Sequence, residues 1–375
     1  MDLISVIIPY YKKKKFIDNS IKSVINQTYS NLEIILVYDD QDKNDLRFLK
    51  QKYSKNVKIK ILVNKENIGA GLSRNNGIDI AKGKYIAFLD ADDVWKKNKL
   101  HNQIKFMQKH KILFSHTSYK IINEKGLNIG KRIARNFMSC NDLLTSCDIG
   151  LSTVIFLKKI YSKNCKFPNL KTKEDFVFWL RILKKGYKIY GLNQQLTIWK
   201  KSKDSLSASS IQKIKDGYKV YNKFMKMSFI FSIYYLILLS LNSIIKKFIY
   251  LQRKYKIENK VAFQLIEGIK TDLKETVEIK DNKELILYCY SVAGTVGYMF
   301  CKIVNVNDKK LYLRAIQLGI GMQRTNISRD VKEDLEANRI YLPKTFREFK
   351  GEKKKILAKG SRHVLYTTGL VSEFS

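Results

Sequence analysis

The segment GKYIAFLDADDVW, residues 83–95, decides the fold class of this chain. Its apolar half favours a buried β-strand, which ends abruptly at three carboxylates, Asp90, Asp92 and Asp93. Unpaired carboxylates at a buried strand end repel one another and lose favourable hydration. A divalent cation removes that conflict, because proteins hold Mg²⁺ or Mn²⁺ with one or two carboxylates together with substrate phosphates. The segment therefore predicts a metal–diphosphate site at the end of a strand.

Strand-like and helix-like segments alternate around this point. Strands are expected over residues 3–9, 31–37, 57–63 and 84–89, and helices over residues 16–27 and 67–81. Such alternation predicts a mostly parallel sheet with right-handed crossovers, in which ligands bind at the carboxyl ends of the strands. Pro9, Asp39 and Asp90 all fall at those ends, so we expect one cleft to reach all three.

The composition restricts the partners and the compartment. The 375 residues leave room for two domains, and the net charge is +37. Because the lysines are spread along the whole chain, we expect no nucleic-acid partner and favour attraction to anionic lipid or phosphorylated substrates. The five cysteines have no spacing typical of zinc or redox sites, and a strand begins within a few residues of Met1. We therefore expect a cytoplasmic protein without a signal peptide.

Residues 228–245 form an uncharged, mostly apolar stretch between Lys226 and the pair Lys246 and Lys247. The length is marginal for crossing a bilayer, and the serines and tyrosines within it argue further against crossing. Two interpretations remain open, an amphipathic helix packed on its own domain and a helix lying in a membrane interface. We treat residues 221–258 as a basic and apolar helical linker, with peripheral contact at the inner face of the cell membrane.

Several short motifs follow one another in the first hundred residues. They are SVIIPY (5–10), SVINQTY (23–29), LEIILV (32–37), NIG (67–69), RNNG (74–77) and LDADD (89–93). In this order they resemble glycosyltransferase family 2, and the resemblance covers residues 1–220. It implies an α/β GT-A fold, which is Rossmann-like with a mostly parallel sheet, and a transferase that binds a nucleoside-diphosphate sugar.

The resemblance also implies roles for single residues. Pro9 and Asp39 match positions at the nucleotide, and Asp39 matches the carboxylate that hydrogen-bonds the base. Arg74 matches a side chain near the ribose and the diphosphate. Asp90 and Asp92 match the pair that positions the ribose and the metal, which would be Mg²⁺ or Mn²⁺.

Three further positions lie next to these motif residues in the sequence. Tyr38 stands where many members of the family carry aspartate, and Asp40 stands where they carry glycine, so the identity of the nucleotide stays open. For Asp93 we prefer the cap of a following helix to a ligand role, because aspartate is a favoured N-cap residue.

A sugar transfer that inverts the anomeric carbon needs a base for the acceptor hydroxyl. The segment KEDFVFWL, residues 173–180, resembles the family's Glu-Asp segment, so Asp175 is the candidate base and Glu174 the second choice. Acidic residues also suit the first turn of a helix. Trp179 lies one turn after Asp175 and could stack on a sugar, although core packing is the preferred interpretation. The acceptor loop is expected within residues 148–153.

A second acidic pattern lies near the carboxyl end. Asn326, Asp330 and Asp334 recur at helical spacing and would form a line of oxygen ligands on one side of a helix. The flanking segments are YCYSVAGTVGY (288–298), LGIGMQ (318–323) and RIYLP (339–343). Together they resemble part of the all-helical squalene/phytoene synthase family, which joins two prenyl diphosphates. The resemblance implies a second diphosphate and Mg²⁺ site at Asn326, Asp330 and Asp334.

The synthase chemistry needs two acidic segments on facing helices, because several Mg²⁺ ions clamp each diphosphate between them. Residues 220–262 offer no such segment, so residues 259–343 are interpreted as a synthase fragment and residues 344–375 as an unassigned basic tail. We predict a metal-dependent glycosyltransferase for a glycan or glycolipid of the cell surface. The alternatives are a prenyltransferase of isoprenoid biosynthesis, which would take prenyl diphosphates only if the segment were completed, and a non-catalytic chimera.

Overall fold

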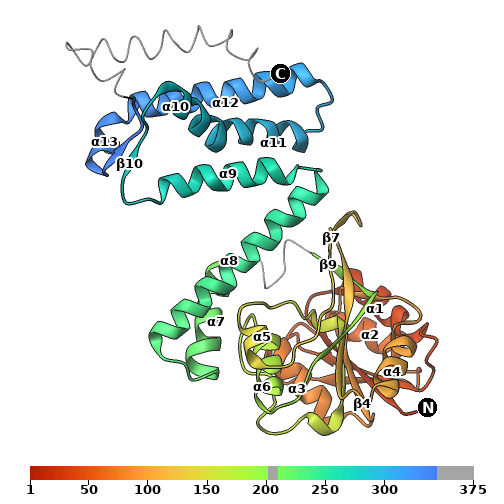
Figure 1. The fold of residues 1–375 in the computed structure, drawn as a ribbon. Helices are drawn as coiled ribbons and strands as arrows, with labels where there is room; N and C mark the ends of the chain where they lie inside the picture. Colours follow the sequence, from red (N-terminus) through yellow and green to blue (C-terminus); the bar gives the residue numbers. More distant parts are fainter. Residues whose placement is uncertain (202–209, 344–375) are drawn as a thin grey trace. The chain divides into compact units, whose positions relative to one another are not determined.

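The computed structural model describes residues 1–201 and 210–343, and it divides the chain into two compact units, Met1–Ile245 and Lys246–Ser375 (Figure 1). Each unit is described separately.

The first unit contains a sheet flanked by helices. Its strands are β1 (Ile4–Tyr10), β2 (Leu32–Tyr38), β3 (Ile59–Val63), β4 (Tyr85–Phe88), β5 (Val94–Trp95), β6 (Phe114–Ile122), β7 (Asn128–Arg132), β8 (Ile155–Leu157) and β9 (Tyr190–Lys200). Its α-helices are α1 (Lys14–Ile25), α2 (Asn44–Tyr53), α3 (Ala70–Ile80), α4 (Lys99–Lys109), α5 (Cys140–Leu144), α6 (Glu174–Lys184), α7 (Ser210–Lys219) and α8 (Phe229–Lys254), the last of which runs on into the second unit. Short helical turns are η1 (Leu151–Thr153), η2 (Lys158–Ile160) and η4 (Val220–Phe224).

The strand order in the described residues is β3-β2-β1-β4-β8-β6-β9-β5, with β7 paired to β6. Strands β1 to β4 are parallel, as the alternation of the sequence predicts. Strand β8 runs antiparallel to β4 and to β6, and β9 returns parallel to β6. The predicted α/β GT-A fold class is confirmed, and its sheet is mixed beyond β4.

Both faces of the sheet are covered (Figure 1). Because side chains alternate along a strand, Val6 and Ile8 pack toward α1, α2 and α4, whereas Ile7 packs with residues of α3 and α6 on the opposite face. All three are fully buried. Two apolar layers therefore fix the sheet, and the carboxyl ends of β1, β2 and β4 point to one edge.

Two expected boundaries shift for local reasons. The strand expected over residues 57–63 begins at Ile59, because Val57 is fully exposed and the Asn56 side chain accepts a hydrogen bond from the Lys58 N–H. The helix expected over residues 67–81 begins at Ala70, because Gly69 has a φ of 85° that a helix does not allow.

The second unit is mainly helical. Its helices are α9 (Asn259–Asp272), α10 (Asn282–Cys289), η5 (Tyr290–Gly294), α11 (Thr295–Ile303), α12 (Lys309–Arg329) and α13 (Val331–Glu336). A small parallel pair, β10 (Val277–Glu278) with β11 (Arg339–Ile340), adds to the expected helices. Helices α11 and α12 pack backbone to backbone, since a Cβ on Gly297 would lie 2.3 Å from the carbonyl oxygen of Ala315. Gly297 is thus required by the close packing of α11 on α12.

Candidate active site

The acidic end of β4 is held by the turn η1. The Ser152 hydroxyl accepts a hydrogen bond from the Asp90 N–H at 3.0 Å and donates to the carboxylate of Asp93. The second oxygen of Asp93 accepts from the backbone N–H of Lys200, at the end of β9. Burial, and then the neighbouring Asp90 and Asp92, raise the pKa of Asp93 well above its ordinary value.

The helix-cap interpretation of Asp93 is wrong. The strand β5 follows Asp93 directly, and both carboxylate oxygens are used by Ser152 and Lys200. Asp93 is therefore a buried residue that connects the end of β4, the turn η1 and strand β9.

Arg74 joins the two acidic segments that the sequence singles out. Its Nη2 donates to Asp90 Oδ1 and its Nη1 to Glu174 Oε1, each at 2.8 Å, while its side chain is 4% exposed. Burial opposes its charge, but Asp90 and Glu174 outweigh this and raise its pKa. Its Nε has no partner in the described structure. One buried guanidinium thus holds the end of β4 against the start of α6.

Asp92 is a partly exposed carboxylate paired with a lysine. Its Oδ2 lies 2.8 Å from the ammonium of Lys13, and burial followed by Asp90 raises its pKa despite this partner. Asp90 and Asp92 together offer hard oxygen donors that are still partly exposed, at 32% and 16%. In residues 1–201 and 210–343 no group of three or more His, Cys, Asp or Glu side chains is placed to hold a metal by itself. Two carboxylates fit a cation that completes its shell with diphosphate and water.

Asp175 lies in the first turn of α6 and is partly buried. Desolvation, and then the charge of Glu174, raise its pKa to about 7. Its Oδ1 accepts from the N–H of Phe176 at 2.7 Å, whereas Glu174 is committed to Arg74. Trp179 is fully buried and meets Phe114 edge-on, so it packs in the core.

Asp39 organises the loop that begins α3. Its carboxylate accepts from the N–H groups of Ile68 and Gly69 and from the amide of Asn64, at 2.8 to 2.9 Å. Pro9 lies one strand away, in register with Val37 at the end of β2. The structure therefore brings Asp39 and Pro9 to the same sheet edge as Asp90.

Tyr38 is a packing residue. Its ring stacks on Tyr10 with centroids 5.2 Å apart, and both rings are fully buried. Asp40 is buried as well, and its side chain accepts from the N–H of Asp42. The two departures from the family pattern thus belong to the protein interior at this edge.

Sequence reasoning missed Lys13 and Ser152. Lys13 is one of four consecutive lysines and Ser152 one of three polar residues in a predicted loop, so neither stands out. The expected acceptor loop, residues 148–153, contains η1 and therefore lies against Asp90 and Asp93.

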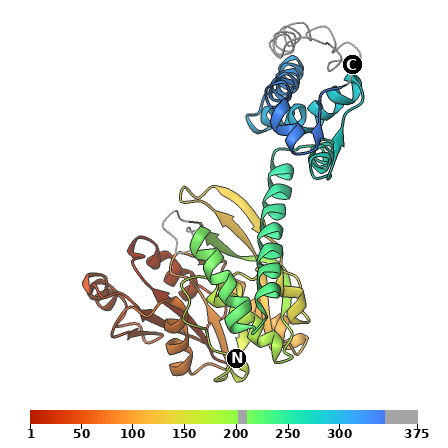
Figure 2. The same ribbon diagram turned by 90° about the vertical axis from the view of Figure 1, so that its left-hand side faces the viewer.

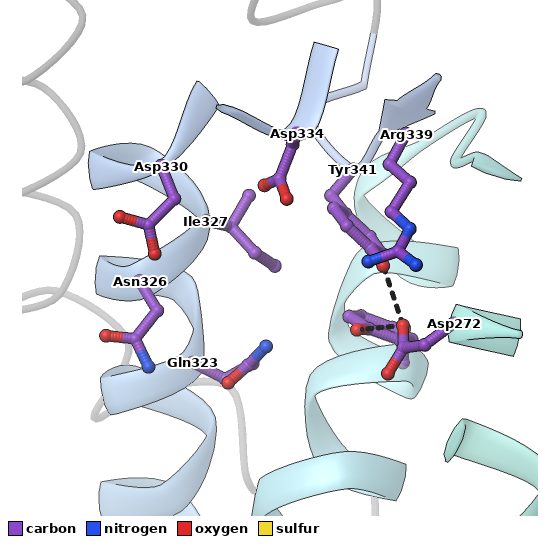
Figure 3. Close-up of a pocket in the computed structure, with 9 residues that line it drawn as sticks. Asp272, Gln323, Asn326, Ile327, Asp330, Asp334, Arg339 and Tyr341 are labelled. Atoms are coloured by element: carbon purple, nitrogen blue, oxygen red, sulfur yellow. Dashed lines mark hydrogen bonds between the residues drawn. The ribbon is translucent and has the colours of Figure 1, made fainter. Parts of the chain in front are cut away.

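The second acidic pattern lines a pocket of about 180 Å³ in the second unit (Figure 3). Asn326 and Asp330 lie on one side, Arg339 and Asp272 lie on the other, and Asp334 lies between them. The expected single helix is wrong, because α12 ends at Arg329 and α13 begins at Val331.

Asp272, at the end of α9, was also missed from the sequence. Its Oδ1 accepts from the hydroxyls of Tyr288 and Tyr341, at 2.6 and 2.7 Å. Asp330 is bound by the exposed guanidinium of Arg329, which lowers its pKa. Burial and then Asp330 raise the pKa of Asp334.

The comparisons with known proteins identify the family of the first unit. Residues 5–175 match the family model of glycosyl transferase family 2. The putative teichuronic acid biosynthesis glycosyltransferase TuaG of Bacillus subtilis is 34% identical over 229 residues, which are 60% of this chain and 90% of TuaG. The chain belongs to glycosyltransferase family 2. Glycosyltransferases of this family commonly use a divalent metal.

A second curated relative is also a glycosyltransferase. The Escherichia coli enzyme WfgD, a UDP-Glc:alpha-D-GlcNAc-diphosphoundecaprenol beta-1,3-glucosyltransferase, is 37% identical over 63% of this chain and 91% of its own length. The crystal structure of residues 1–349 of Staphylococcus aureus TarS in complex with UDP-GlcNAc has a TM-score of 0.51 at 18% identity, covering 86% of this chain and 92% of that one. The similarity to TarS shows the fold alone.

The carboxyl-terminal part has a family match of its own. Residues 239–366 match the squalene/phytoene synthase family model, which confirms the predicted resemblance. The match is longer than the predicted block of residues 263–343, and its last part lies outside the described residues.

Proposed function

We propose that this glycosyltransferase moves a sugar from a nucleoside-diphosphate sugar to a glycan or lipid-linked acceptor, with inversion at the anomeric carbon. The observation that carries the proposal is the Arg74 bridge, because it fixes the acidic end of β4 beside the start of α6, which bears Asp175. Inverting transfer needs residues that bind the sugar donor and a base for the acceptor. We assign the first role to the end of β4 and the second to the start of α6.

On the donor side, Pro9 and Asp39 would receive the nucleotide and Arg74 would hold Asp90 in place. Asp90 and Asp92 would hold the cation, Mg²⁺ or Mn²⁺, which when bound neutralises charge developing on the departing diphosphate. The ion pair between Lys13 and Asp92 must break when Asp92 binds the cation, because the ammonium of Lys13 and the cation compete for the same carboxylate oxygen.

On the acceptor side, Asp175 would act as the base and Glu174 would hold its segment through Arg74. The acceptor hydroxyl gives its proton to the Asp175 carboxylate, and its oxygen forms a bond to the anomeric carbon. The bond from that carbon to the diphosphate oxygen breaks on the opposite face. The raised pKa of Asp175, about 7, suits a base that works near neutral pH.

The names of the relatives support a proposal for the acceptor and the location. WfgD is named for an acceptor linked to diphosphoundecaprenol, and TuaG for teichuronic acid biosynthesis. We accordingly assign this chain to synthesis of a cell-surface polysaccharide, at the cytoplasmic face of a membrane that carries the lipid-linked acceptor.

The test is release of nucleoside diphosphate by the purified full chain. UDP-glucose and UDP-N-acetylglucosamine are offered with a GlcNAc-diphospho-lipid analogue, in Mn²⁺, in Mg²⁺ and in chelator. We expect acceptor-dependent release with one donor, lost in chelator and in Asp92→Ala. Release that continues in Asp92→Ala, or no release with any nucleotide sugar, contradicts the proposal.

For the organisation of the chain, we propose a glycosyltransferase domain over residues 1–220, the linker 221–258 and a synthase-like domain over 259–343. Asp272 is one carboxylate facing Asp330 and Asp334, and it already accepts from two tyrosines. We therefore expect no hydrocarbon product when the chain is incubated with farnesyl or geranylgeranyl diphosphate.

A further inference from the structure

One face of α8 is fixed to the glycosyltransferase core. Ser232 and Leu239 are buried, Tyr235 stacks on Tyr221, and the side-chain amide of Asn242 donates to the carbonyl of Thr145 at 3.0 Å. The α8 residues lie three or four positions apart, so they share one side of the helix. All of these contacts lie inside the first unit.

The opposite face of α8 is apolar and exposed. Ile230, Ile237, Leu241 and Ile244 are 76%, 52%, 48% and 64% exposed, and they recur at helical spacing. Further exposed apolar side chains beside them are Phe229, Phe231, Tyr234 and Ile245. Figure 2 shows that α8 is one continuous helix over this length. Single exposed apolar residues are ordinary, but a continuous stripe of them marks a surface that binds a partner.

The charges around α8 indicate which partner fits. Between Asp216 and Glu258 the sequence has no acidic residue, whereas it has eight lysines and arginines. They are Lys219, Lys223, Lys226, Lys246, Lys247, Arg253, Lys254 and Lys256. Two copies joined through α8 would bring like charges together, but anionic lipid headgroups would attract them.

The contacts of the inner face argue against a bilayer-spanning position of α8. By length and composition alone, α8 is one of two helices in the described residues that are long and apolar enough to cross a membrane. Only 11% of its most apolar 18-residue stretch is buried in the structure. Insertion would pull Leu239 and Asn242 away from the core they pack on. A helix held on one side and apolar on the other lies in the plane of the interface.

We propose that the outer face of α8, defined by Ile230, Ile237, Leu241 and Ile244, docks on an anionic lipid bilayer. The docking holds the catalytic domain at the surface where a lipid-linked acceptor is presented. Only this last consequence rests on the proposed function. The docking itself rests on the two faces of the helix and on the basic residues around it.

The test is flotation of the full chain with mixed phosphatidylcholine–phosphatidylglycerol vesicles and with pure phosphatidylcholine vesicles. We expect binding to the mixed vesicles, weakened about ten-fold or more in Ile237→Gln/Leu241→Gln, because two apolar side chains leave the lipid. The matched control is Leu318→Gln/Met322→Gln on α12, a pair with the same four-residue spacing and 65% and 60% exposure. It should bind like the wild type.

Three results overturn the docking. The wild type fails to float with anionic vesicles, the α12 pair loses as much binding as the α8 pair, or the soluble chain is a dimer that Ile237→Gln/Leu241→Gln converts to a monomer. The last result would assign the face to a second copy. Circular dichroism confirms that each variant is folded. Turnover of a water-soluble acceptor analogue reports on the proposed function separately, since it needs no vesicle.

Discussion

Two acidic groups in this chain differ in how the protein compensates their charge. At the end of β4, Asp90 is held by a buried arginine, and Asp93 is buried with both oxygens occupied. In the second unit, Asp330 is partly exposed and pairs with its exposed neighbour Arg329, and Asp272 accepts from two tyrosines. Both groups suggest metal and diphosphate when only their residue types are considered.

The difference lies in what the carboxylates are tied to. The first group is connected through Arg74 to α6 and through Ser152 to the turn η1, so a change at one carboxylate reaches a candidate base. The second group is connected to an adjacent side chain and to the tyrosines of its own unit. Asp272 also connects separate elements, because it accepts from Tyr288 of α10 and from Tyr341. We infer that a connection from the acidic end of a strand to a candidate base, more than a concentration of acids, distinguishes a working site from a remnant.

The largest effect is expected from removing the base. Asp175→Asn should lower kcat by about 10³-fold, since general base catalysis contributes roughly 10²- to 10⁴-fold. Binding of nucleoside diphosphate, measured by calorimetry, should stay within about two-fold of the wild type. Asp330→Asn is the counterpart in the second group and should leave kcat unchanged. Equal losses in both variants would erase the distinction between the two groups.

The next effect concerns the tie itself. Arg74→Met leaves Asp90 and Glu174 without their buried partner, and breaking such a pair costs about 3–5 kcal/mol of unfolding free energy. We expect a fall in the denaturation midpoint together with a loss of transfer of about 10²-fold. Arg74→Met/Glu174→Gln removes one of the stranded charges and should recover part of the stability. No recovery would show that Arg74 does not couple the segments.

The pH dependence comes third. Asp175 must be deprotonated to accept the hydroxyl proton, and its pKa is raised to about 7. Below that pH, kcat/KM should fall about ten-fold per pH unit. Glu174→Gln removes a negative neighbour that raises this pKa, so the midpoint should move to lower pH. A profile that is flat from pH 5 to 8 would show that Asp175 is not the titrating base.

The local parts of this site could be predicted from the sequence, but its cross-links could not. Asp39, Asp90 and Asp175 each stand in a short motif, and the strand alternation brings Asp39 and Asp90 to one edge. The hydrogen bond from Ser152 to Asp93 joins residues 59 positions apart, and local patterns carry no signal for it. The predicted helix cap at Asp93 is wrong for the same reason. Cap preference depends on the residues that follow directly, whereas the carboxylate of Asp93 accepts hydrogen bonds from Ser152 of η1 and Lys200 of β9.

A smaller effect is expected at Lys13, because its ammonium holds the oxygen of Asp92 that a cation needs. Lys13→Met should tighten the apparent affinity for Mn²⁺ about five-fold, since a partly exposed ion pair contributes about 1 kcal/mol at most. A Mn²⁺ titration of donor turnover measures it. Lys14→Met is the control, since Lys14 pairs with Asp45 instead of Asp92. Unchanged Mn²⁺ affinity in Lys13→Met would mean that Asp92 is not a cation ligand.

The smallest effect is expected in the second group, and it decides whether that group still matters for sugar transfer. Asp330→Asn/Asp334→Asn removes two carboxylates from the pocket of Figure 3. Transfer to a soluble acceptor should stay within about two-fold of the wild type, because neither carboxylate belongs to the proposed transfer site. Asp90→Asn/Asp92→Asn is the matched double change at β4 and should abolish transfer. A clear loss in the first variant would show that the two acidic groups act together, and the division between site and remnant would then fail.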